Sequence, residues 1–164
     1  MSKTQENLMA AFAGESQANR KYLAYAKQAE KEGLPQVAKL FRAAAEAETI
    51  HAHAHLRYAG KIKNTMENLE DAIAGETYEF TKMYPDMLAD AEAEGESNIK
   101  RHLAWVNAVE EVHANLYKKA LAAKGNVADV DYYVCSVCGY THEGPYAGKC
   151  PICNAAESAF YKVA

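Results

Sequence analysis

Apolar and polar residues over most of the chain follow the pattern of long helices. Residues 4–123 are rich in Ala, Glu, Lys, Leu and Gln, and helix-breaking residues occur there at only a few places. The breaks EGLP, AGKIKN, EGES and AKGN divide this stretch into segments. We therefore predict four helices, at about residues 4–32, 35–60, 65–94 and 97–123.

The end of the chain has a different pattern. From Tyr132 on, glycines, prolines, aromatic residues and cysteines replace alanine. A segment this short cannot form a stable hydrophobic core unless a metal or a disulfide cross-links it. We predict a mainly α protein made of a four-helix domain at 1–123, a linker at 124–131 and a small metal-binding module at 132–164.

The two halves of the helical region carry the same phrase. ENLMAAFAGES at residues 6–16 recurs as ENLEDAIAGET at residues 67–77, which pairs Glu15 with Glu76 at an offset of 61. This repeat predicts two related helical hairpins, each with one glutamate on its first helix.

A Glu-x-x-His motif follows in each half, at an offset of 62. Glu48 and His51 form the first motif, and Glu110 and His113 form the second. Residues three apart on a helix project from one face, and their neighbours on these faces are core-type residues. A single such motif on an Ala-rich helix is usually solvated. Two motifs in register with a duplicated glutamate favour a metal site.

Several inward-facing carboxylates need cations between them. One Glu from each of two helices plus a Glu-x-x-His from each of two others is the ligand set of di-iron and di-manganese bundles. Oxygen-rich donors favour iron or manganese over structural zinc. Glu79, whose counterpart in the first half is Ala18, breaks the symmetry. The predicted ligands are Glu15, Glu48, His51, Glu76, Glu79, Glu110 and His113.

The four cysteines form two C-x-x-C pairs separated by eleven residues, and they predict a tetrahedral sulfur site. They are Cys135, Cys138, Cys150 and Cys153. Zinc and iron both accept four thiolates, so the spacing supports a structural zinc ribbon at least as well as an iron centre.

Composition narrows the class of protein. With 49% hydrophobic and 24% charged residues, the chain is typical of a soluble globular protein. It has no apolar run long enough to cross a membrane and no secretory h-region at its N-terminus, so we expect a cytoplasmic protein. A net charge of -4 without a basic run argues against nucleic acid as the main partner.

The motifs AFAGES, ETIH, AGETYE, EEVH and CSVCGY with CPIC resemble those of rubrerythrins, across nearly the whole chain. The resemblance implies a ferritin-like bundle with a non-haem di-iron centre and a rubredoxin-like Fe(Cys)4 tail. It also implies peroxide reduction to water as part of an oxidative-stress response. Electrons would come from rubredoxin or an NAD(P)H-dependent reductase through the Fe(Cys)4 site.

The resemblance further implies a role for each ligand. Glu48 and Glu110 bridge the irons, Glu15 serves one iron, and Glu76 with His113 serves the other.

The same resemblance implies that the first iron exchanges Glu79 for His51 when its oxidation state changes. It also places two tyrosines beside the irons as the catalytic hydrogen-bond donors. These tyrosines are Tyr22 and Tyr84.

The same residues are compatible with two other functions. A ferroxidase or iron-handling protein would use the same ligands with oxygen or peroxide, and a helical bundle with a zinc ribbon would serve as an interaction module. The electron donor, the metal loaded at each site and the preferred oxidant are not encoded in these motifs.

The short connection between the halves predicts an exchange of helices between chains. If the second and third helices run parallel, the chain must return over roughly 34 Å between them. A linker of about five residues reaches only ~17 Å. We therefore expect a homodimer in which the first hairpin of one chain pairs with the second hairpin of another. An ordinary up-down-up-down bundle is the rival arrangement.

Overall fold

The computed structural model describes residues 2–163, which form two compact units divided between Lys63 and Asn64. The helices are α1 Lys3–Lys31, α2 Pro35–Tyr58, α3 Thr65–Tyr78, the π-helical segment η1 Glu79–Met83, α4 Tyr84–Ala93 and α5 Ser97–Ala122. The tail contains β1 Tyr132–Cys135, β2 Thr141–Glu143, the 3-10 helix η2 Glu157–Ala159 and β3 Phe160–Lys162. The helix positions agree with the predicted segments to within a few residues.

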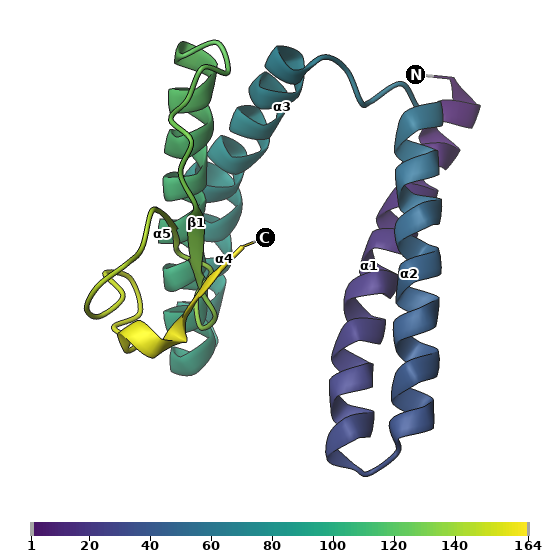
Figure 1. Ribbon diagram of the computed structural model, residues 1–164, viewed down its shortest axis with the longest axis horizontal. Coiled ribbons are helices and arrows are strands. Elements are labelled where there is room, and N and C mark those ends of the chain that lie inside the picture. The colour runs from purple at the N-terminus through teal and green to yellow at the C-terminus, as the bar shows by residue number, and fades with distance from the viewer. Residues whose placement is uncertain (1, 164) are drawn as a thin grey trace. The chain divides into compact units, whose positions relative to one another are not determined.

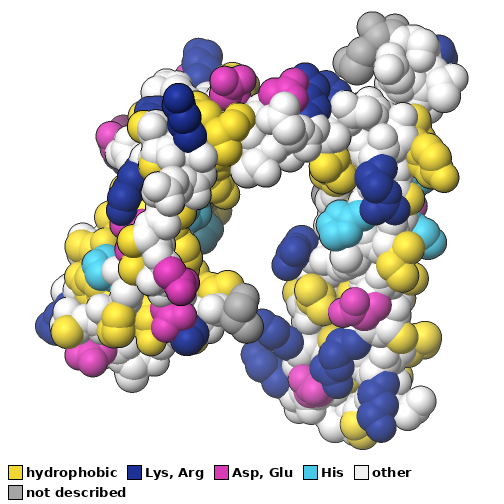
Figure 2. Space-filling model, turned by 45° about the horizontal axis from the view of Figure 1, so that its top comes forward, with side chains coloured by type: hydrophobic (Ala, Val, Ile, Leu, Met, Phe, Trp, Pro, Cys, Tyr) yellow, Lys and Arg dark blue, Asp and Glu magenta, His cyan; other side chains and the backbone are white. Residues whose placement is uncertain are grey.

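The first unit is a hairpin of α1 and α2 (Figure 1). A capping box begins α1, because the hydroxyl of Ser2 accepts from the N–H of Gln5 and the amide oxygen of Gln5 accepts from the N–H of Ser2. Gly33, at φ 72°, turns the chain, and Pro35 occupies the first turn of α2. Lys and Arg side chains gather near this loop, whereas histidines lie farther along the hairpin (Figure 2).

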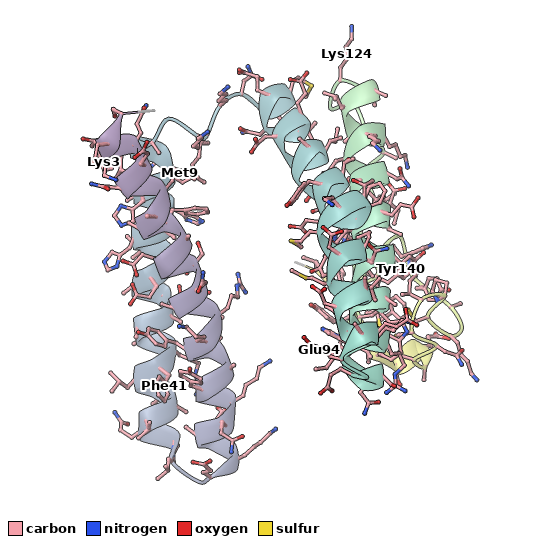
Figure 3. The ribbon with its side chains drawn as sticks, turned by 180° about the vertical axis from the view of Figure 1, so that it is seen from behind. Lys3, Met9, Phe41, Glu94, Lys124 and Tyr140 are labelled. Carbon is pink, nitrogen blue, oxygen red and sulfur yellow. The ribbon has the colours of Figure 1, made fainter. Side chains whose placement is uncertain are left out.

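Small residues let α1 and α2 approach closely. Ala26, Ala29 and Ala38 are buried between the helices. Phe41 packs beside them, with its ring centroid 6.1 Å from that of Tyr22 (Figure 3). These contacts hold together the end of the hairpin next to the loop.

One buried polar side chain sets the register of α1 against α2. The amide of Asn19 donates to the carbonyl oxygen of Ala45 at 2.6 Å and to the hydroxyl of Thr49 at 2.8 Å. A buried amide left without these partners would be costly, so the register that satisfies it is favoured. This register also sets the heights of Glu15 and Glu48.

In the second unit, α3, η1 and α4 form one interrupted helix that packs against α5. Thr81 lies four residues before Pro85, at the point where a proline ring would collide with an α-helical carbonyl. The π-helical turn at this place accommodates the proline. A proline inside a helix ordinarily bends it, and here the structure has a π segment that ends two residues before Pro85.

A π-helical turn contains one extra residue, which explains why the repeat changes its offset. The offset is 61 at Glu76 and becomes 62 beyond η1. With the larger offset, Tyr84 is the counterpart of Tyr22, and the glycines of the two hairpin loops also align, Gly33 with Gly95. The extra residue therefore lies within η1, immediately after the ligand candidate Glu79.

The tail is a three-stranded antiparallel sheet in the order β2-β1-β3. Val134 in β1 lies opposite Thr141 in β2 and Tyr161 in β3. The cysteine cluster packs against Val109 of α5, which is 2% exposed, with Trp105 beside it. In Figure 1, β1 lies beside α5. Tyr140, labelled in Figure 3, lies where the cysteine module meets this helix.

Helices long and apolar enough to cross a membrane are absent from residues 2–163.

Candidate metal sites

Each unit brings three of the predicted ligands together. In the first unit Glu15 projects from α1, and Glu48 and His51 project from α2; one ligand atom of each lies within 4.8 Å of the others. His51 Nδ1 lies 2.9 Å from Glu48 Oε2. The Glu48 side chain is 18% exposed and the His51 side chain is 53% exposed, so the imidazole lies at the rim of this cluster.

The second unit repeats the arrangement in a more buried form. Glu76 projects from α3, and Glu110 and His113 project from α5, again with ligand atoms within 4.8 Å. His113 Nδ1 lies 2.8 Å from Glu110 Oε2 and 3.9 Å from Glu76 Oε2. Nδ1 is thus the nitrogen that faces the carboxylates.

Burial, together with the hydrogen bond to Glu110 and the charges of Glu110 and Glu79, raises the pKa of Glu76 to about 7, and burial has the largest effect. A divalent cation between these carboxylates would remove the repulsion. The donors are carboxylate oxygens with one imidazole nitrogen, which suits iron or manganese. The residues therefore fit the metal that the repeat predicts.

Glu79 lies outside the Glu76–Glu110–His113 triad, but burial and charges of that triad shift its pKa. Burial and the charge of Glu110 raise its pKa, and His113 lowers it. Its position at the start of η1 accounts for this, because the π turn begins one helical turn after Glu76.

Two tyrosines border the second triad. The pKa of Tyr84 is raised by burial and by the charges of Glu110, Glu79 and Glu76. Burial and the charges of Glu76 and Glu110 also raise the pKa of Tyr117. The sequence motifs do not single out Tyr117 as a site residue. Its position four residues after His113, on the same face of α5, is the signal that could have identified it. Tyr22 packs on Phe41 in the first unit.

A cavity of about 490 Å³ opens beside the second triad. Its walls are Leu69, Glu76, His113, Leu116, Tyr117, Ala120, Tyr132 and Thr141. Apolar residues from α3 and α5 thus surround a few polar groups, as is usual in small-molecule sites.

The four cysteine sulfurs form the third cluster, also within 4.8 Å of one another. Cys135 Sγ lies 3.7 Å from Cys153 Sγ, and Cys138 Sγ lies 3.6 Å from Cys150 Sγ. Four thiolates at about 2.3 Å from a tetrahedral metal would be ~3.8 Å apart, whereas a disulfide requires about 2.05 Å. The thiols are therefore arranged for a metal.

Two equivalent backbone turns present these thiols. The N–H of Gly139 donates to the carbonyl of Cys135 at 2.8 Å, and the N–H of Asn154 donates to that of Cys150 at 3.0 Å. Gly139 and Asn154 both have positive φ, at 86° and 62°, as the left-handed end of such a turn requires. Burial acts to raise the pKa of Cys135, but the N–H groups of Cys138 and its neighbour outweigh it and the pKa is lowered.

Side-chain contacts connect the cysteine module with α5. His113 Nε2 lies 3.0 Å from the hydroxyl of Thr141, and Lys119 forms an ion pair with Glu143. The module therefore touches a predicted metal ligand of the helical part directly.

Two family models match the chain. Residues 6–121 match the model described as rubrerythrin, and residues 133–161 match that described as the rubredoxin-like domain of rubrerythrin. The mainly helical fold class with a rubredoxin-like tail is thereby confirmed. The prediction of iron cofactors is confirmed too, since the four-cysteine cluster and the carboxylate clusters accompany these matches.

Curated relatives and a solved structure are similar over almost the full length. Nigerythrin of Nitratidesulfovibrio vulgaris is 38% identical over 96% of this chain and 85% of its own. Rubrerythrin of Porphyromonas gingivalis is 36% identical over 97% of this chain and 89% of its own. A structure of nigerythrin in a partially reduced state is 33% identical, covers 99% of this chain and 88% of that chain, and has a TM-score of 0.60.

Proposed function

We propose that this chain, which belongs to the rubrerythrin family, reduces hydrogen peroxide to water at a di-iron site fed with electrons through its Fe(Cys)4 tail. The observation that carries the proposal is the pair of matching triads. Each consists of two glutamates and a histidine, with ligand atoms within 4.8 Å.

Two irons need more donors than either triad supplies, so the proposed site combines both hairpins. It takes Glu15, Glu48 and His51 from the first hairpin and Glu76, Glu79, Glu110 and His113 from the second. In this assignment residues 1–123 are the ferritin-like domain, residues 124–131 the linker and residues 132–164 the rubredoxin-like domain. Glu48 and Glu110, the first residues of the two Glu-x-x-His motifs, would each contribute a carboxylate to holding the two irons.

Reduction of one peroxide to two waters consumes two electrons and two protons. The glutamates and histidines of the two triads would hold two ferrous ions, which would supply the two electrons that break the O–O bond. The chain's own residues orient the peroxide and deliver protons. The raised pKa of Tyr84 keeps its hydroxyl protonated and able to donate beside Glu110. Tyr22, its counterpart in the repeat, has the same proposed role.

Electrons for the next turnover enter through the tail, from rubredoxin or from an NAD(P)H-dependent reductase. A four-thiolate iron changes oxidation state with little rearrangement, which suits this role. Support comes from the packing of the cysteine cluster against Val109, in the same helix as Glu110 and His113.

A second candidate function is Fe²⁺ oxidation with oxygen or peroxide. The cavity of about 490 Å³ beside Glu76 and His113 favours it, because a carboxylate at an open cavity can bind an incoming cation.

The oxidant separates the two functions. We expect the fully reduced protein to be reoxidised by peroxide at a rate at least roughly tenfold above that with an equal concentration of oxygen, in stopped-flow recordings of visible absorption. Metal analysis of the same sample measures how much iron each chain carries, and the visible absorption of the Fe(Cys)4 centre shows whether the tail is loaded. Faster reoxidation by oxygen, with added Fe²⁺ consumed, would instead support the ferroxidase function.

The observed helix limits support an exchange of hairpins between two chains. From Glu48 to the end of α2 at Tyr58, and from Thr65 to Glu76, the helices cover a return path of about 32 Å. The connection from Tyr58 to Thr65 reaches at most ~25 Å. If α2 and α3 run parallel at one site, a single chain cannot close it, so we propose a homodimer with two composite sites.

Mixed dimers test the exchange. We expect Glu48→Gln and Glu110→Gln homodimers to be inactive, because every site carries one altered ligand. In a heterodimer of the two variants, isolated with two affinity tags, exchanged hairpins place both substitutions in one site and leave the other intact. Peroxide turnover should then return to about half of the wild-type rate. An inactive heterodimer would support the unexchanged bundle.

A further inference from the structure

The two ring nitrogens of His113 have different partners. Nδ1 faces the carboxylates of Glu110 and Glu76, at 2.8 and 3.9 Å. Nε2 lies 3.0 Å from the hydroxyl of Thr141, which belongs to strand β2 of the cysteine module. The ring is therefore held between the helical carboxylates and the tail.

The partners of Thr141 determine where its single proton lies. Its Oγ1 is 3.1 Å from the carbonyl oxygen of Gly139, and a carbonyl can only accept. When the hydroxyl proton is donated to Gly139, Oγ1 is the acceptor towards His113. Nε2 of His113 then carries the hydrogen, and in the neutral ring Nδ1 keeps its lone pair for a metal.

The first triad has no equivalent of this contact. His51 Nδ1 lies 2.9 Å from Glu48 Oε2, as in the second triad. Among residues 2–163, however, no group hydrogen-bonds His51 Nε2, and the side chain is 53% exposed against 27% for His113. The repeat makes the two histidines equivalent in sequence, and the tail makes them different.

We propose that Thr141 is the positioning residue of His113, fixing both the tautomer and the orientation of the ring so that Nδ1 points at the metal. The inference rests on the proposed role of His113 as a ligand. Partners of this kind on the far nitrogen of a ligating histidine raise its basicity, and their loss typically lowers metal affinity 10–100-fold. The tail thus contributes to iron binding in the helical part as well as to electron delivery.

Thr141→Val tests the proposal, with Thr141→Ser as the rescue. Valine keeps the shape and suits the strand position opposite Val134, so the sheet should persist. In the reduced full-length holoprotein we expect the valine variant to bind iron at one of its two carboxylate sites roughly 10–100-fold more weakly, measured by competition with a colorimetric Fe²⁺ chelator. The serine variant should stay close to the wild type.

A tautomer measurement adds a readout that a packing defect would leave unchanged. In the zinc-loaded full-length protein with ¹⁵N-labelled histidine, NMR should detect the Nε2–H of His113 in the wild type and the serine variant. In the valine variant this proton should exchange with water at least roughly tenfold faster. The visible absorption of the Fe(Cys)4 site in the iron-loaded variant checks that the tail is folded.

Tyr146→Phe is the matched control, since it removes another hydroxyl of the same module, one that donates to the carbonyl of Lys149. Unchanged affinity and proton exchange in Thr141→Val would overturn the proposal, and so would a serine variant as weak as the valine variant. His113→Ala separates this failure from failure of the proposed function. If that variant binds two irons as tightly as the wild type, His113 is not a ligand and both proposals are wrong.

Discussion

Replacing Glu110 by glutamine is expected to lower peroxide turnover by roughly 10³-fold, the largest effect we predict for a single carboxylate. The side chain is 14% exposed, lies 2.8 Å from the Nδ1 of His113 and raises the pKa of Glu76. Glutamine keeps the shape but removes the negative charge that Glu110 would contribute to holding the cations. A loss of several kcal/mol in cation and transition-state stabilisation corresponds to this factor.

Glu111→Gln is the control for this experiment. Glu111 is the next residue of α5 and is exposed, so its substitution removes the same charge from the chain without touching the triad. We expect its turnover and iron content to match the wild type. Steady-state peroxide consumption and iron analysis should be measured together on both variants. Equal losses in the two variants would mean that Glu110 has no special role.

Replacing Cys138 by serine should abolish peroxide reduction driven by a reductase and NAD(P)H. Cys138 is 8% exposed and belongs to the buried cluster around Val109. A small module of three short strands gains most of its folding free energy from the metal, which is worth about 10–16 kcal/mol in comparable four-ligand zinc modules. Losing one thiolate therefore removes the thiolate-to-iron visible absorption together with the ordered structure of the tail.

The same variant should still consume peroxide when a chemical reductant replaces the reductase and Fe²⁺ is supplied in excess, because the helical ligands remain. Its iron should be bound more weakly, since the contact of Thr141 with His113 is lost with the tail. Ser136→Ala, an exposed position between the first two cysteines, is the matched control and should retain both absorption and turnover. The visible spectrum and the rates with each electron source distinguish these outcomes. Wild-type turnover with NAD(P)H in Cys138→Ser would show that electrons reach the di-iron site without the tail.

Local patterns were enough to predict the helices, because their ends are marked by residues with a direct conformational effect. Gly33 and Pro35 end α1 and begin α2 where the sequence predicts the break. The three-residue spacing of Glu110 and His113 likewise brings both onto one face of α5, as the helical period requires. Such features depend on nearby residues only, so they are visible before any tertiary contact is known.

The π segment was only partly predictable from the sequence. The change of offset from 61 to 62 contains its signal, but a one-residue shift in a repeat can also be taken up by a loop. The structure places the extra residue in η1, next to Glu79, because the proline at position 85 disfavours an α-helical turn there. The pairing of Tyr22 with Tyr84 depends on this position.

By itself the sequence determined the repeated hairpins, the Glu-x-x-His pairs and the paired cysteines, since each is a short pattern whose chemistry depends on spacing along the chain. Only the tertiary structure decided which groups surround those ligands. The contact of Thr141 with His113, 28 residues apart, and the nearness of Tyr117 to Glu76 come from packing between elements. Packing depends on the shapes of both surfaces at once, and no local spacing encodes it.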